Sequence, residues 1–454
     1  MAQTTSSTRH GYHGIGTAAI IVGKMNVAPG HGSTRVGGSP VIARAMWTKA
    51  SLAFLLVLSP CLDRACSAPK RLELGFPQLS ERVQVVLPEN YSPDRKWPAV
   101  FYYHGTGGSP TTELIQAHTR NQDWIVVGMT YTQEGNLPAT AEYIEKEFRI
   151  FTSTRRHLAT KWNLDLQRCH VAGFSKGGWM AGFLLQHDPS LAGGIILGAG
   201  HQFLIRKPVR FRRSKLLFVG VGRLDANYPF ALRALVHYRS LGARTTMDTW
   251  HGLGHRFPDS GSPALSQWLN IAANPRGDHG SEASEWLEGQ IDTIKGMPDL
   301  VDQWVACRDL EKAPYVRLLG AAAEVRVSSL LTALEKGGRV AAEARALKAH
   351  QVLLRQETKG HTVAQCQRLA ADYLALSEAH RGTRQAEIAL GDHERVKKLV
   401  LHLKEQRKIM QEQEAEAQKK KDLTPPGEGD IDPFKRAPDN RPRIPRNPLA
   451  PRRR

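Results

Sequence analysis

Three side chains of this sequence have the types needed for acyl transfer, and each follows a short apolar segment. Ser175 is the centre of a G-x-S-x-G motif that begins at Gly173 and ends at Gly177. Glycines on both sides of a serine let the backbone turn sharply from strand to helix and hold the hydroxyl up as a nucleophile. Asp225 and His255 follow later apolar runs. A hydroxyl, an imidazole and a carboxylate together can activate a serine for attack on a carbonyl carbon.

The acid and the base each have a competitor nearby in the sequence. Asp225 comes just past an apolar strand and can accept a hydrogen bond from one imidazole nitrogen, although it could instead cap the helix that starts near Tyr228. Asp248 is the alternative acid, but it lies inside a strand rather than beyond one. His255 is favoured over His251 because a glycine-containing loop separates it from the last strand and leaves it free to reach the serine.

A second glycine-rich turn, HGTGG at 104–108, follows an earlier apolar strand. Attack on an ester carbonyl needs two backbone N–H groups aimed at the developing oxyanion. We assign these donors to Lys176, which follows the nucleophile, and to Thr106 or Gly107. The alternatives are a loop that only turns the chain and a phosphate-binding loop, for which the characteristic lysine spacing is missing.

Three aromatic residues near these motifs are candidate walls of a substrate cleft: Phe174, Trp179 and Tyr228. Packing in the core is the alternative role for all three. Only about 14 residues separate the strand ending at Gly200 from the one starting at Lys215, which is too few for a cap domain. We therefore expect an open cleft that suits a bulky or polymeric ester substrate.

The elements that position these residues alternate between strands and helices. Nearly continuous apolar runs, typical of buried parallel strands, occupy 98–105, 123–131, 168–174, 193–200 and 215–222, with a last strand at 244–252 and two earlier ones near 71–75 and 82–88. Amphipathic helices are predicted at 140–162 and 228–242. This alternation predicts an α/β fold with a doubly wound, mostly parallel sheet without a large cap, whose ligand site lies at the carboxyl ends of the strands.

The sequence changes character twice after this catalytic domain, which we place at 69–276. Residues 277–422 are rich in Ala, Leu, Glu, Lys and Arg at helical spacing, and they predict a helical accessory region. Its simplest role is a surface array or a dimerisation element. The tail at 423–454 is basic and rich in Pro and Arg, so we expect it to be disordered.

The beginning of the chain has the order of a secretory signal peptide. At 46–68 a lysine precedes the apolar run that starts at Leu52, and small residues follow. Because the pattern begins at a methionine, we expect translation to start at Met46, which makes 1–45 an annotation artefact; a disordered natural extension is the alternative. The predicted location is secreted or periplasmic.

The charge and the cysteines limit the other classes of function. The chain has 454 residues and a formal net charge of +19, much of it in the tail and at 206–213, with no recognisable nucleic-acid module. We expect no nucleic-acid partner, and instead contact of the basic tail with an anionic cell envelope. Cys169, Cys307 and Cys366 are an odd set beyond the leader. The sequence does not decide between a Cys307–Cys366 disulfide and buried free thiols.

Together, the strands followed by HGTGG, GFSKGG, GRLDAN and HGLGH resemble the α/β-hydrolase superfamily. The resemblance covers roughly residues 97–272. It is to the secreted esterase branch, which includes polyhydroxybutyrate depolymerases and feruloyl or acetylxylan esterases. It implies an exported serine hydrolase that cleaves carboxylic esters through an acyl-enzyme, with no metal and no organic cofactor.

Two other functions fit the same residues. A peptidase of the prolyl-oligopeptidase type uses the same triad on amides, but the propeller domain of those enzymes is missing from the sequence. A non-catalytic cell-envelope protein would keep the hydrolase fold as a relic and bind its partner through the helical region.

Overall fold

The computed structural model describes the chain at residues 70–77, 79, 81–133, 140–201, 210–211, 215–359 and 362–423. The predicted signal peptide, the start at Met46 and the basic tail beyond Leu423 lie outside these residues, as does most of the connection between Gly200 and Lys215. None of the helices in the described ranges combines the length and the apolar character that crossing a bilayer requires.

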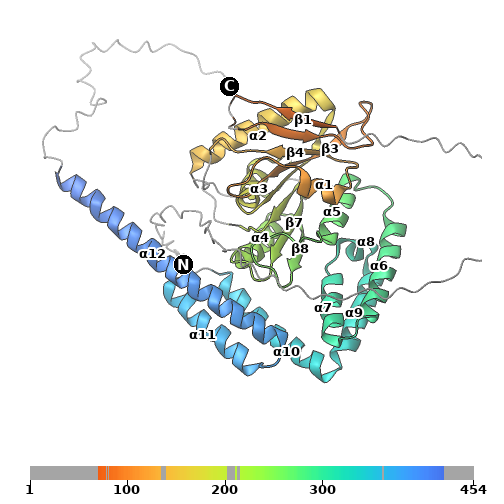
Figure 1. The fold of residues 1–454 in the computed structure, drawn as a ribbon, viewed down its shortest axis with the longest axis vertical. Coiled ribbons are helices and arrows are strands. Elements are labelled where there is room, and N and C mark those ends of the chain that lie inside the picture. The colour runs from red at the N-terminus through yellow and green to blue at the C-terminus, as the bar shows by residue number, and fades with distance from the viewer. Residues whose placement is uncertain are drawn as a thin grey trace, which may run out of the picture.

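Eight strands between Arg71 and Trp250 form one sheet (Figure 1). They are β1 (Arg71–Leu74), β2 (Val83–Val86), β3 (Trp97–Tyr103), β4 (Ile125–Met129), β5 (Leu164–Phe174), β6 (Gly193–Leu197), β7 (Leu216–Gly222) and β8 (Arg244–Trp250). The order is β1-β2-β4-β3-β5-β6-β7-β8, and β2 is antiparallel to both of its neighbours. All other pairs are parallel. The predicted doubly wound, mostly parallel sheet is confirmed.

Helices cover both faces of this sheet, which explains the continuous apolar runs. Every residue of β3, β4 and β6 is buried. One face is covered by α2 (Ala141–Trp162), α3 (Lys176–His187) and α4 (Tyr228–Ser240), and the other by α1 (Glu113–Thr119) and α5 (Pro263–Ala273). Alternate residues of β3 serve the two faces: Phe101 packs against Phe151 of α2, whereas Val100 joins Ile115 of α1.

Seven further helices follow the sheet domain. They are α6 (Gly280–Lys295), α7 (Leu300–Leu310), α8 (Pro314–Leu319), α9 (Ala321–Glu335), α10 (Gly338–Glu357), α11 (Val363–Ala379) and α12 (Arg384–Leu423). Residues of α6 to α10 form an apolar core of their own. Residues of α10, α11 and α12 instead belong to the same buried cluster as one face of the sheet, and the far end of α12 projects beyond its neighbours (Figure 1).

The three cysteines in the described residues are all buried and free. Cys307 lies in the core of α6 to α10, where its thiol donates to the carbonyl of Val327, 3.5 Å away, whereas Cys366 lies in the cluster shared with the sheet. Burial raises the pKa of the Cys307 thiol to about 11. Of the two alternatives that the sequence left open, a Cys307–Cys366 bridge and buried free thiols, the structure has the buried free thiols.

Candidate active site

Ser175 is the turn between β5 and α3, and its own backbone makes the sharp bend. Its φ is +55° and its ψ is −117°, a combination that costs an L-residue conformational energy. The helix begins at the next residue, so the hydroxyl stands at the N-terminus of α3. Its exposed fraction is 6%, so the surrounding loops cover much of it.

The two flanking glycines act differently from the way the motif suggested. Neither has a positive φ; both are needed because other backbone passes close to them. A Cβ on Gly173 would lie 2.2 Å from the carbonyl carbon of Gly177, and one on Gly177 would lie 1.9 Å from the carbonyl oxygen of Tyr103. The glycines therefore let α3 press against β3 and β5, while the turn itself is in the serine.

His255 joins the other two predicted residues although they are far apart in sequence. Its Nε2 lies 2.7 Å from Oγ of Ser175, and its Nδ1 lies 2.8 Å from Oδ2 of Asp225. An ionised carboxylate can only accept, so Nδ1–H donates to Asp225 and leaves Nε2 to accept the serine proton. The three groups come from the loops after β5, β7 and β8, which meet at one edge of the parallel sheet.

Asp225 is held in place from its other side as well. Its Oδ1 accepts the backbone N–H of Asn227 at 2.8 Å, and the Asn227 side chain donates to the carbonyl of Gly198 at 2.8 Å. The carboxylate is 1% exposed. Asn227, not Asp225, is the N-cap of α4, so the aspartate supports the turn before the helix with one oxygen and holds His255 with the other.

The electrostatics of His255 follow from this arrangement. Burial lowers its pKa, but the hydrogen bond and the charge of Asp225 together outweigh burial and raise the pKa above its ordinary value. The imidazole is 41% exposed at its side chain, so it borders solvent while its partner carboxylate does not. It is placed to take a proton from the serine and to be stabilised once it is charged.

The competing acid and base lie elsewhere. Oδ2 of Asp248 accepts from the indole of Trp250 at 2.8 Å and from the hydroxyl of Ser262 at 2.6 Å, and its burial raises its pKa. Nε2 of His251 lies 2.9 Å from Oδ2 of Asp309 in α7. Asp248 therefore anchors the turn before α5, and His251 contacts the helical region.

The loop at 104–108 lies against the nucleophile. A Cβ on Gly105 would be 3.5 Å from Cβ of Ser175, and the loop closes on itself through the N–H of Gly108 and the carbonyl of Gly105 at 3.2 Å. Thr106 and Gly107 are exposed at its tip, and Gly107 has a φ of +74°. The predicted donors thus lie on the two segments next to the serine, this loop and the first residue of α3.

The neighbouring side chains also fix this loop and the start of α3. The carbonyl of His104 accepts from the hydroxyl of Tyr131 at 2.5 Å. The ammonium of Lys176 lies 3.7 Å from the ring centre of the same tyrosine, and the lysine side chain is buried. Tyr131 therefore connects the strand end that carries the glycine-rich loop with the residue that follows the nucleophile.

Only one of the three predicted aromatic walls lies at the catalytic residues. The ring of Phe174 is half-buried, and its centre is 5.3 Å from that of His255. Trp179 is buried and packs edge-on against Phe230, and Tyr228 is buried beneath the guanidinium of Arg223. The expectation for Trp179 and Tyr228 is corrected: both are packing residues rather than walls of an open cleft.

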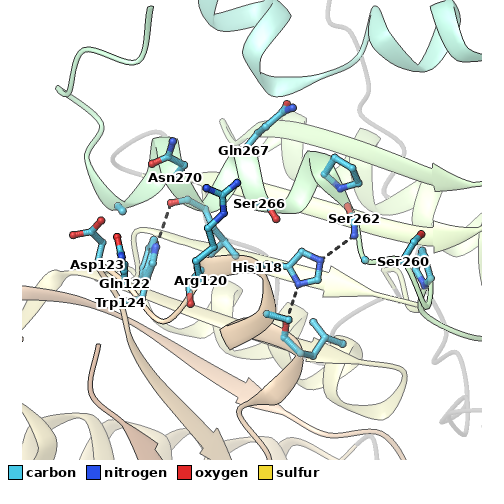
Figure 2. Close-up of a pocket in the computed structure, with 18 of the residues that line it drawn as sticks. His118, Arg120, Gln122, Asp123, Trp124, Ser260, Ser262, Ser266, Gln267 and Asn270 are labelled. Carbon is cyan, nitrogen blue, oxygen red and sulfur yellow. Dashed lines mark hydrogen bonds between the residues drawn. The ribbon is translucent and has the colours of Figure 1, made fainter. Parts of the chain in front are cut away.

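A large cavity among the described residues is separate from these three side chains. It measures about 1310 Å³ and lies between α1, the turn at 257–263, α5 and the start of the helical region. Figure 2 shows His118 on its wall, between the carbonyl of Leu114 at 2.7 Å and the N–H of Ser262 at 2.9 Å. Neither Ser175 nor His255 lines this cavity. No group of three or more metal-ligating side chains occurs among the described residues.

The strand order, with a serine at the strand-to-helix turn after β5, defines the α/β-hydrolase fold. Similar solved structures include a carboxylesterase from Mesorhizobium loti, 18% identical over 44% of this chain and 98% of that one, with a TM-score of 0.37. A Bacillus cereus carboxylesterase is 17% identical over 46% of this chain and 96% of that one, with a TM-score of 0.36. A phospholipase/carboxylesterase from Dyadobacter fermentans is 13% identical over 43% of this chain and 97% of that one, with a TM-score of 0.34. No protein-family model and no curated protein matches the sequence.

Sequence reasoning missed Arg223 and Asn227, which flank the acid. Both are polar residues of the GRLDAN segment, directly after a buried strand. Their positions were the available signal, because polar side chains beside a candidate triad acid at a strand end commonly orient it.

Proposed function

We propose that this protein is an exported serine hydrolase that cleaves carboxylic esters. The observation that carries the proposal is the continuous hydrogen-bonded chain from Ser175 through His255 to Asp225, at 2.7 Å and 2.8 Å. The strained backbone of the serine supports it, because such conformations cluster at sites of chemistry.

The reaction follows from where the protons lie. Oγ of Ser175 attacks the ester carbonyl carbon while His255 takes the hydroxyl proton, and Asp225 stabilises the resulting imidazolium. The oxyanion is bound by the N–H of Lys176 and that of Thr106 or Gly107. The imidazolium then protonates the departing alcohol. Water hydrolyses the acyl-enzyme by the same route, which returns the proton to the serine. No step requires a metal or an organic cofactor.

The finer assignments belong to the same proposal. The signal-peptide order at 46–68 supports export, to the periplasm or the medium. The motifs after the strands support the secreted esterase branch that includes polyhydroxybutyrate depolymerases and feruloyl esterases. The connection between Gly200 and Lys215, which is too short for a cap domain, supports an open cleft and a polymeric ester as substrate. Phe174 is the aromatic residue placed to contact the acyl or alkoxy group next to the imidazole.

The test is removal of the nucleophile in the folded protein. Ser175→Ala should abolish hydrolysis of short p-nitrophenyl esters and labelling by a fluorophosphonate probe, whereas Ser328→Ala, at an exposed position of α9, should change neither. Circular dichroism checks that both variants are folded. Labelling of the alanine variant at another serine refutes the assignment.

A substrate panel then separates the alternatives. Polyester, feruloylated xylan, simple acyl esters and aminoacyl amides should be compared for kcat/KM. We expect esters to be preferred. Preference for the amides would favour a peptidase, and no turnover together with no labelling would favour a non-catalytic binding protein.

A further inference from the structure

The loop that carries Asp225 is bound to the C-terminal helices by a buried charge network. Arg223 lies two residues before the acid, and its Nη1 and Nη2 donate to Oδ1 and Oδ2 of Asp392 in α12 at 3.2 Å and 2.7 Å. The same Nη2 is 3.0 Å from Nε2 of His350 in α10. The side chains of the arginine and the aspartate are 7% and 1% exposed, so water does not compete for these contacts.

A second arginine completes the network on the helical side. Nη2 of Arg395 donates to Oδ1 of Asp392 at 3.0 Å and to Oε2 of Glu357 at 2.8 Å. Two guanidinium groups thus face two buried carboxylates, and Tyr373 adds a hydrogen bond to Glu357 at 2.8 Å. Although burial favours the neutral acid, the charges of Arg223 and Arg395 and the hydrogen bond to His350 hold the pKa of Asp392 well below its usual range.

The loop that carries His255 is connected to the same structure. The backbone N–H of Arg223 donates to the carbonyl of Trp250 at 2.9 Å, and that of Leu224 donates to the carbonyl of Leu253 at 2.8 Å. His251, four residues before the base, contacts Asp309 of α7 at 2.9 Å. Backbone hydrogen bonds therefore join the loop that carries Asp225 to the loop that carries His255, and each loop has its own contact with the helical region.

We propose that the C-terminal helices act as a positioning element for the triad, with Arg223 as the residue through which Asp392 fixes Asp225 relative to His255. The inference rests on the proposed function, because it assigns a purpose to the accessory helices in that reaction. A bidentate guanidinium–carboxylate contact defines orientation as well as distance. Holding Arg223 in this way restricts the short segment from 223 to 225, and the backbone bonds transmit the restriction to the segment that leads to the base.

The test replaces the arginine without stranding its partner. In Arg223→Met, Asp392 keeps Arg395 and His350, so the buried carboxylate remains compensated. We expect kcat for a p-nitrophenyl ester to fall roughly 10- to 100-fold, because small displacements of catalytic groups have effects of this size. KM should stay within about twofold, because the lost interaction is not with substrate. The acid limb of kcat/KM should move to lower pH, because a loosened Asp225 no longer raises the pKa of His255.

The matched control is another buried ion pair of the sheet domain. Arg155 of α2 lies 2.8 Å from Asp188, and the side chains are 10% and 5% exposed. Arg155→Met should lower thermal stability while leaving the acid limb and the kcat of the folded fraction unchanged. An Arg223→Met variant that behaves in the same way, or that keeps the parent kcat and pH profile, overturns the proposal.

Two further measurements keep the test decisive. If Arg223→Met does not fold, Arg223→Lys keeps the charge but loses the bidentate contact, and it should show a smaller change in the same direction; a folded lysine variant with parental kinetics contradicts the proposal.

The downfield proton resonance of His255 Nδ1–H reports the contact with Asp225 without turnover. If the parent protein shows no esterase activity, the proposed function fails, and this resonance still decides the positioning role: its loss in Arg223→Met supports that role and its persistence opposes it.

Discussion

The imidazole of His255 lies 2.8 Å from the carboxylate of Asp225, and the two residues differ sharply in their access to solvent. The carboxylate is buried and has two fixed hydrogen-bond donors, whereas the imidazole borders the solvent. Because the buried partner is the acceptor, it decides which ring nitrogen carries the proton. The buried carboxylate of Asp225 therefore determines which nitrogen of the accessible His255 imidazole can accept the serine proton.

Asp225→Asn should lower kcat for ester hydrolysis by about 10⁴-fold, as loss of the acid does in other triads, while the protein stays folded. An amide can donate to Nδ1, which moves the ring proton to Nε2 and removes the acceptor for the serine hydroxyl. Steady-state kinetics with a p-nitrophenyl ester measure the change. Asp248→Asn is the matched control, because that half-buried side chain accepts hydrogen bonds from Trp250 and Ser262 and not from His255, and the variant should retain most of the activity. A larger loss of kcat in Asp248→Asn than in Asp225→Asn would show that Asp248, and not Asp225, is the catalytic acid.

The pH dependence of kcat/KM should have an acid limb above pH 6.5, the ordinary pKa of histidine, because Asp225 raises the pKa of His255. Protonated His255 cannot accept the serine proton, so activity falls as the pH drops through that value. The folding stability that His255 contributes changes with pH in the opposite direction to the activity. This contribution is fully present below the pKa of His255 in the unfolded chain, and it is lost as the pH rises through the pKa in the folded protein. An initial-rate profile locates the limb, and a limb at or below pH 6.5 would contradict this account.

Gly177→Ala should destabilise the protein by at least about 3 kcal/mol or prevent folding, because overpacking against rigid backbone cannot relax. Its Cβ would lie 1.9 Å from the carbonyl oxygen of Tyr103. Gly289→Ala in α6 is the control, because nothing lies within 4 Å of its added Cβ. That variant should gain about 0.5 to 1 kcal/mol from helix propensity. Urea unfolding of both variants measures the free energies, and equal values for the pair would show that the close approach is not needed.

Phe174→Ala and Trp179→Ala should separate substrate contact from packing. The tryptophan variant should lose about 3 to 5 kcal/mol of stability, because a large buried side chain is removed. Its kinetic preference among acyl chain lengths should not change. The phenylalanine variant should be more stable than the tryptophan variant and should show an altered preference, because its ring lies beside His255. Thermal unfolding and kcat/KM for a series of acyl esters measure both effects. A change in acyl preference confined to Trp179→Ala would show that Trp179, and not Phe174, contacts the substrate.

The fold could be predicted because its physical signal is local in the sequence. Strands covered on both faces must be apolar throughout, so β3, β4 and β6 stand out as continuous runs. In a parallel sheet the strand ends meet at one edge, which is why residues after β5, β7 and β8 could be expected to converge. Ser175, Asp225 and His255 do lie together there.

The remaining features depend on contacts that a single sequence does not encode locally. Arg223 and Asp392 are separated by 169 residues, and nothing in a helical run of Ala, Leu and charged residues indicates which one faces a strand end. The burial of Trp179 depends on Phe230 of α4, a neighbour supplied by the packing of two helices. The motif did show that a turn was needed at 173–177, but it did not show that the serine, and neither glycine, takes the positive φ.

The backbone of Ser175 has a consequence for how this chain can change. Glycine enters its φ and ψ region without the penalty of a Cβ, whereas serine there costs about 1 to 3 kcal/mol of folding stability. Selection for stability alone would therefore favour glycine at this position in any descendant that used the domain only as a scaffold. The hydroxyl persists against that gradient only where hydrolysis itself is under selection.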